Sequence, residues 1–139
     1  MSQNNNGLIN WDVPFCDISF LNRLLSSHDN LSHITRSKDI VFEVYRKKQN
    51  ESLKIFCCRQ YVMSITLIYK VLDEFDHNNI IYIGGEWNGY TNDAKQYCLD
   101  SKIGLYVANE MNGALWSDEY WAYYKKDSDG DAINFSRGE

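Results

Sequence analysis

Apolar residues recur along this 139-residue chain with two different periods, and the order of these periods predicts an α/β fold. Residues 39–45 alternate with a period of two, which indicates a strand with Asp39 and Glu43 on one face and apolar residues such as Phe42 on the other. Residues 52–60 follow a polar turn and are rich in Ile, Phe and Cys. They are predicted to complete a hairpin and to lie centrally in the sheet.

Helices are predicted where the spacing of apolar residues lengthens to the helical period. Asp17 is suited to cap the first helix, because its carboxylate can accept a backbone N–H of the first turn. The predicted order is a helix over 17–28, a short edge strand over 31–35, the hairpin, a helix over 61–75, a strand over 80–83, a helix over 91–103, a strand over 105–107 and a C-terminal helix.

The stretch from Ile80 to Leu115 is the part around which the predicted fold is organised. An apolar run ends at Gly84, Thr91 is a good helix cap, and Gly104 ends that helix before the next strand. Two strands joined by a short helix must pair in parallel, and parallel strands need a covering layer. The sequence therefore predicts an α/β domain with a central mixed sheet flanked by helices.

Length and composition favour one domain over residues 1–139. With 44% hydrophobic residues the chain can bury one sizeable core and has no room for a second ordinary domain. Residues 1–10 are polar and are predicted to be frayed, and residues 125–139 are predicted to form a polar tail.

Charge and cysteine usage narrow the predicted partners and location. A net charge of −5 and a pI near 5.1 disfavour binding to a phosphate backbone without a local basic patch. The four cysteines show no CxxC spacing and are typical of buried free thiols in a reducing compartment. No apolar run approaches the roughly 20 residues of a membrane span. We expect a cytoplasmic protein that does not cross a membrane.

Several local strings resemble the restriction-endonuclease-like, or PD-(D/E)xK, nucleases of the Mrr-type branch. Lys38–Val41 looks like the strand that begins with an Asp, and Phe56–Tyr61 looks like the following strand with its (E/Q)xK signature. The stretch from Ile80 to Leu105 is similar to the distal half of such domains. The resemblance covers roughly residues 17–115 and implies a restriction-endonuclease-like core.

The resemblance implies a site in which two carboxylates hold Mg²⁺ and a lysine assists the reaction. Asp39 matches the first carboxylate, whereas Cys57 stands at the second and Arg59 at the lysine. Mg²⁺ does not favour a thiol, and arginine does not lose a proton at working pH. The first hypothesis is therefore a non-catalytic binding or assembly module on a degenerate nuclease-like fold, without a cofactor.

An active Mg²⁺-dependent DNA endonuclease is the alternative. Glu43 shares a face with Asp39 and can supply the missing carboxylate beside Arg59. Glu51 and Lys54 form an Glu-x-x-Lys string that can substitute if the strands pair in a shifted register.

A third hypothesis is a small-ligand-binding protein that uses the loop 84–90. The loop follows a predicted parallel strand, where open α/β sheets often bind ligands. Its paired glycines allow close backbone approach, and Glu86, Trp87 and Tyr90 can line a pocket.

Aromatic residues recur at helical spacing near the C-terminus, at Trp116, Tyr120, Tyr123 and Tyr124. Such a stripe either covers the open side of the sheet or forms an interface with another copy of the chain. A homo-oligomer, in the simplest case a homodimer, follows from the second reading.

Overall fold

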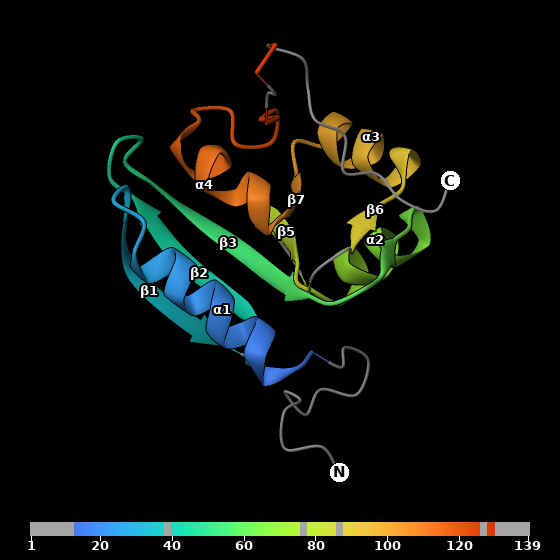
Figure 1. The fold of residues 1–139 in the computed structure, drawn as a ribbon, viewed down its shortest axis with the longest axis horizontal. Coiled ribbons are helices and arrows are strands. Elements are labelled where there is room, and N and C mark those ends of the chain that lie inside the picture. The colour runs from blue at the N-terminus through green and yellow to red at the C-terminus, as the bar shows by residue number, and fades with distance from the viewer. Residues whose placement is uncertain (1–12, 38–39, 76–77, 86–87, 126–127, 130–139) are drawn as a thin grey trace.

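Two kinds of strand pairing meet in the central sheet of the computed structural model, which describes residues 13–37, 40–75, 78–85, 88–125 and 128–129 (Figure 1). Strands β1, β2 and β3 are antiparallel, and β3, β5 and β7 are parallel, in the order β1-β2-β3-β5-β7. The mixed sheet of the predicted α/β domain is confirmed. The elements are α1 (Phe15–Ser26), β1 (Leu31–Ser37), β2 (Val41–Arg46), β3 (Glu51–Cys58), β4 (Val62–Met63), α2 (Ile65–Glu74), β5 (Ile80–Ile83), β6 (Gly89–Tyr90), α3 (Asn92–Asp100), β7 (Gly104–Val107) and α4 (Ala108–Trp116).

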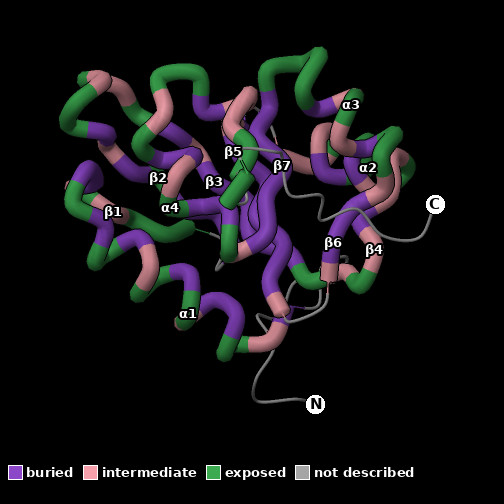
Figure 2. The backbone as a smooth tube through the Cα atoms, turned by 45° about the horizontal axis from the view of Figure 1, so that its top comes forward, coloured by how far each residue is buried: buried purple, intermediate pink, exposed green. Residues whose placement is uncertain are grey.

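The helices cover the sheet in two layers. Helices α1 and α4 lie on one face, where His28 at the end of α1 bonds the Asn112 carbonyl of α4 at 3.0 Å. Helices α2 and α3 connect the parallel strands and contact one another through Tyr69 and Tyr97, whose ring centroids are 5.2 Å apart. Figure 2 shows buried residues concentrated along the central strands between these layers.

The predicted hairpin is confirmed, with β2 and β3 pairing in antiparallel register. Phe42 lies opposite Ile55, and both are fully buried against the α1 and α4 layer. Glu43 lies opposite Lys54 on the other face, where Glu43 is exposed. The alternation of polar and apolar residues therefore set which face of β2 enters the core.

Four details differ from the sequence prediction. Helix α3 ends at Asp100 with Ser101 as its C-cap, and Gly104 begins β7, so Gly104 does not end the helix. Pro14 occupies the N-cap of α1, so Asp17 does not cap the helix but lies buried in its first turn. Helix α2 begins at Ile65, because Ser64 caps it and the residues before Ser64 form the two-residue strand β4, which pairs with β6. Helix α4 ends at Trp116, so the C-terminal aromatic residues do not share one helix.

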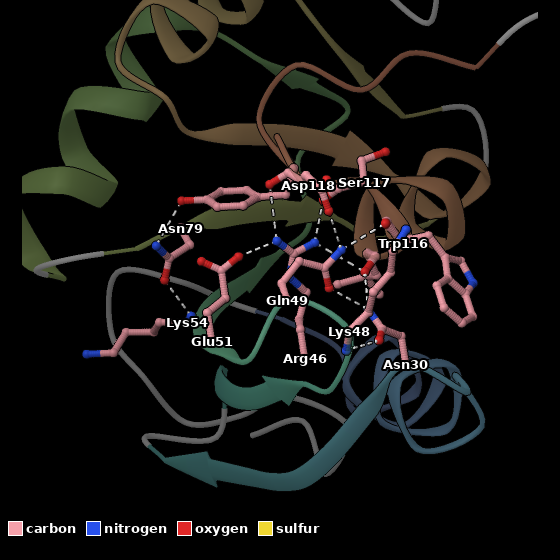
Figure 3. Close-up of polar contacts among 12 residues, drawn as sticks. Asn30, Arg46, Lys48, Gln49, Glu51, Lys54, Asn79, Trp116, Ser117 and Asp118 are labelled. Carbon is pink, nitrogen blue, oxygen red and sulfur yellow. Dashed lines mark hydrogen bonds and ion pairs between the residues drawn. The ribbon is translucent and has the colours of Figure 1, made fainter.

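Arg46, at the end of β2, joins the hairpin to the C-terminus of α4 (Figure 3). Its side chain is fully buried and donates to the carbonyl of Ser117 at 2.5 Å and to those of Leu115 and Asp118 at 3.3 Å. It also forms an ion pair with Glu51. The last carbonyls of a helix lack partners within the helix and carry partial negative charge, so a guanidinium satisfies them well.

Neighbouring amides complete this junction. Asn30 donates to the Leu115 carbonyl at 3.0 Å and accepts from the backbone N–H of Lys48 at 2.8 Å. Gln49 donates to the Trp116 carbonyl at 3.0 Å. The turn between β2 and β3 is thus fixed against the end of α4.

We expect Arg46→Met to lower the free energy of unfolding by about 3 kcal/mol, because the buried carbonyl of Leu115, the part-buried carbonyls of Ser117 and Asp118 and the Glu51 carboxylate lose a charged donor. Urea denaturation measures the change. Arg23→Met, at an exposed position of α1, should change it by less than about 0.5 kcal/mol. Equal effects of the two substitutions would contradict the role given to Arg46.

Candidate functional site

The carboxyl ends of β3 and β5 lie side by side, because the two strands pair in parallel with Cys58 opposite Ile83. Open α/β sheets commonly bind ligands at this edge. The chain continues from β3 into Arg59 and from β5 into Gly84 and Gly85. The first turn of α1 reaches the same edge and brings Asp17 with it.

Asp17 and Arg59 form the central ion pair of this edge. The Nη1 atom of Arg59 lies 3.3 Å from Oδ2 and 3.4 Å from Oδ1 of Asp17. The Asp17 side chain is only 9% exposed, whereas the Arg59 side chain is 41% exposed. The Asp17 side chain is therefore covered by protein, and the Arg59 side chain is partly open to solvent.

Two glycines allow this approach. A Cβ atom on Gly84 would lie 2.9 Å from Cγ of Asp17. Gly85 has a φ of +91°, and a Cβ there would lie 2.6 Å from Nδ2 of Asn88 and 3.2 Å from Nε of Arg59. Asn88 fixes the turn by donating to the Gly84 carbonyl at 2.8 Å. Larger residues at positions 84 and 85 would thus push the ion pair apart.

Burial determines the electrostatics of the edge. It raises the pKa of the Asp17 carboxyl above its ordinary value, and the charge and hydrogen bond of Arg59 offset this only in part. Burial also raises the pKa of Cys57 and Cys58 far above the usual range of a thiol. Both cysteines are therefore protonated near neutral pH and are poor metal ligands in that form.

The structure brings together two described residues of the predicted nuclease site, Glu43 and Lys54, but not Glu51 or Arg59. Glu43 pairs with Lys54 at 4.0 Å on the exposed face, and Glu51 pairs with Arg46. Arg59 lies well apart from Lys54, because Cys58, the residue before Arg59, is already four residues or about 13 Å further along the strand. Asp39 lies outside the described residues. Among the residues that the structure describes, no three His, Cys, Asp or Glu side chains form a group that could hold a metal ion.

The predicted ligand loop is described only in part. Glu86 and Trp87 lie outside the described residues. Tyr90 lies in β6 and is 3% exposed, and its hydroxyl donates to Oε2 of Glu110 at 3.0 Å. Tyr90 therefore hydrogen-bonds Glu110 in the protein interior and does not line an open pocket.

Glu110 belongs to a buried polar cluster that the sequence analysis did not identify. Its Oε1 accepts from the backbone N–H of Val107 at 3.0 Å, at the start of α4. Lys95 donates to the Leu105 carbonyl at 2.6 Å, and its Nζ lies 4.1 Å from the centroid of the Tyr106 ring. β7 is an edge strand of the sheet, and the Lys95 bond satisfies one of its carbonyls. That carbonyl is then not free to pair with a strand of another chain.

The C-terminal aromatic residues divide between core and surface. Tyr120 is 8% exposed, and its carbonyl accepts from the Tyr106 hydroxyl. Tyr123 lies over Gly113, where an added Cβ would meet its ring. Trp116 and Tyr124 are 41% and 50% exposed. Part of the predicted stripe thus covers the sheet, and two members remain at the surface.

Comparison of the chain with protein-family models, curated proteins and solved structures finds no match. The resemblance to nucleases therefore stays a prediction from local strings. None of the helices in the described ranges combines the length and the apolar character that a membrane crossing requires.

Asp17 is the functional candidate that the sequence analysis missed. It precedes Leu21 and Leu25 by four and eight residues, so it lies on the apolar face of α1. A carboxylate on such a face needs a buried partner. That position was the available signal, although the sequence alone does not name Arg59 as the partner.

The buried Glu110 predicts a pH-dependent stability. Burial raises its pKa above the ordinary value of 4.5, against opposing contributions from Lys95 and its hydrogen bonds. The folded state then holds the proton more tightly than the unfolded chain. Its contribution to stability is complete below pH 4.5 and is lost as the pH rises through the folded pKa.

Glu110→Gln retains an acceptor oxygen and cannot ionise. We expect the free energy of unfolding of the wild type to fall relative to this variant as the pH rises above 4.5, measured by urea denaturation at a series of pH values. The exposed Glu119→Gln makes the same chemical change at the surface and serves as the matched control. A pH-independent difference for Glu110→Gln would contradict the account.

Proposed function

We propose that this protein is a non-catalytic binding module on a nuclease-like core, and that its ligand contacts Arg59 at the carboxyl edge of the parallel strands. The observation that carries the proposal is the ion pair between Asp17 and Arg59, in which the Asp17 side chain is 9% exposed and the Arg59 side chain is 41% exposed. A ligand that reaches this edge therefore meets a positive group held in place by the fold.

The donors of Arg59 support a binding role. Asp17 contacts only the Nη1 nitrogen. Within the described part of the chain, Nη2 and Nε of Arg59 have no hydrogen-bond partner. A guanidinium presents five N–H donors in a planar fork, so most of this capacity remains for a ligand.

The chemistry of the neighbouring positions supports the absence of catalysis. Where the nuclease resemblance implies a metal-binding carboxylate, Cys57 is fully buried, and its raised pKa keeps it a neutral thiol. Where the resemblance implies a lysine, Arg59 forms an ion pair with Asp17 instead. Function resides in the site and not in the fold, so a sheet of this type can persist without the reaction.

A ligand panel followed by thermal unfolding tests the binding role. A ligand at ten times its Kd adds about 1.4 kcal/mol of stability, or roughly 4 °C in Tm for a domain of this size. We expect at least one small-molecule class to raise Tm in the wild type and to lose that effect in Arg59→Met. Arg23→Met removes the same charge at an exposed position of α1 and should retain the shift. A shift that persists in Arg59→Met would place the binding site elsewhere.

A nuclease assay tests the absence of catalysis separately. The protein is incubated with duplex DNA and Mg²⁺ or Mn²⁺, and we expect the DNA to remain intact. Cleavage by the wild type that disappears in Asp39→Ala would overturn this part of the proposal in favour of the active endonuclease.

A further inference from the structure

We propose that the ligand of this site is a small oxyanion, a phosphate or a carboxylate, which binds Arg59 in place of Asp17 while Asp17 takes up a proton. The inference rests on the proposed function and adds the class of ligand and its coupling to pH. It follows from which partner of the ion pair a ligand can reach and from what surrounds the other.

The accessible partner is the cation. The Arg59 side chain is 41% exposed, whereas the Asp17 side chain is 9% exposed. A ligand therefore approaches the guanidinium first. Phosphate and carboxylate oxygens match its planar fork, because two parallel N–H donors can bind two oxygens of one anion.

The existing contact leaves room for such an exchange. Asp17 contacts one nitrogen of Arg59, at 3.3 and 3.4 Å, which are long distances for charge-assisted hydrogen bonds. An oxyanion that engages two nitrogens makes more and shorter bonds than Asp17 does. Gly85 lies next to the guanidinium and has no side chain to cover it, whereas a Cβ at this position would lie 3.2 Å from Nε of Arg59.

Among the described residues, Arg59 is the only cation that interacts with the Asp17 carboxylate. The titratable groups around it are Cys16 on the same helix, whose Sγ lies 4.0 Å from its Oδ1, and, from the neighbouring elements, Cys57, Cys58, Tyr82 and Arg59. Of these groups only Arg59 carries a positive charge. An anion on Arg59 therefore leaves the Asp17 carboxylate without its counter-charge and beside a new negative charge.

Protonation resolves this conflict. A proton from solvent adds to a carboxylate oxygen of Asp17 and gives a neutral carboxylic acid, so the bound state holds one more proton than the free state. Burial already raises the pKa of Asp17 in the free protein, and loss of its counter-charge raises that pKa further. Affinity for the anion must then fall as the pH rises through the interval between these two values.

The experiment is an NMR titration with two probes whose charges are fixed over the pH range used. Sulfate stands in for a phosphate group and trifluoroacetate for a carboxylate, with chloride keeping the ionic strength constant. The Kd is measured between about pH 5 and pH 8, and we expect a total weakening of roughly two- to fivefold as the pH rises, because a partly exposed ion pair contributes at most about 1 kcal/mol. Binding of one probe and not the other identifies which oxyanion geometry the site accepts.

Two variants separate this inference from a purely structural role of the ion pair. Asp17→Asn frees Arg59 and cannot ionise, so we expect it to bind the probe roughly two- to fivefold more tightly and without the pH dependence. The exposed Asp100→Asn makes the same change in net charge and should bind as the wild type does. Arg59→Met should abolish binding.

Three results would overturn the inference. They are a wild-type affinity that does not change with pH, a weaker affinity in Asp17→Asn, and the absence of binding by both probes. Each leaves the proposed function standing if Arg59→Met still removes the thermal shift of another ligand class. Probe binding that survives Arg59→Met would count against both.

Discussion

A carboxylate inside a protein requires a compensating charge, and the ion pair of Asp17 with Arg59 meets this requirement at the carboxyl edge of the sheet. Asp17 enters the interior because it lies on the apolar face of α1 with Leu21 and Leu25. Arg59 reaches it from the end of β3, and Gly84 gives the space for the contact. The position of α1 over the sheet and the chemistry of the site thus depend on the same interaction.

Arg46 provides the corresponding constraint at the opposite end of the β2–β3 hairpin. It is fully buried and bonds the terminal carbonyls of α4, so the helix dipole and a fixed cation stabilise each other. The two arginines differ in exposure, and this difference separates their roles. Arg46 is fully buried and structural, whereas the Arg59 side chain is 41% exposed.

The spacing of apolar residues predicted most of the fold, because a half-buried strand buries every second residue and a helix buries residues three or four positions apart. The hairpin and the helix capped by Thr91 were predicted from alternation and caps, which are local signals, whereas Gly104 begins β7 and does not end α3. The paired strands β4 and β6 contain two residues each, too few to show a period. The spacing of the C-terminal aromatic residues suggested a helix, but α4 ends at Trp116. The carbonyl of Ser117 then accepts a hydrogen bond from Arg46, and Tyr120 packs into the core.

The candidate site was less accessible to sequence reasoning, since it joins residues 42 positions apart. Arg59 was identified through the nuclease resemblance, but its partner was expected on the adjoining strand and not on α1. Glu43 and Glu51 satisfy other cations, Lys54 and Arg46, through a register that local strings do not reveal.

A double-mutant cycle on Asp17 and Arg59 tests the central claim most directly. The free energy of unfolding is measured near neutral pH for the wild type, Asp17→Asn, Arg59→Met and the double variant. Because Arg59 is 41% exposed and partly screened by solvent, the account predicts a favourable coupling of about 1 kcal/mol. Additive effects, within about 0.3 kcal/mol, would show that the two side chains do not depend on each other and would contradict the account.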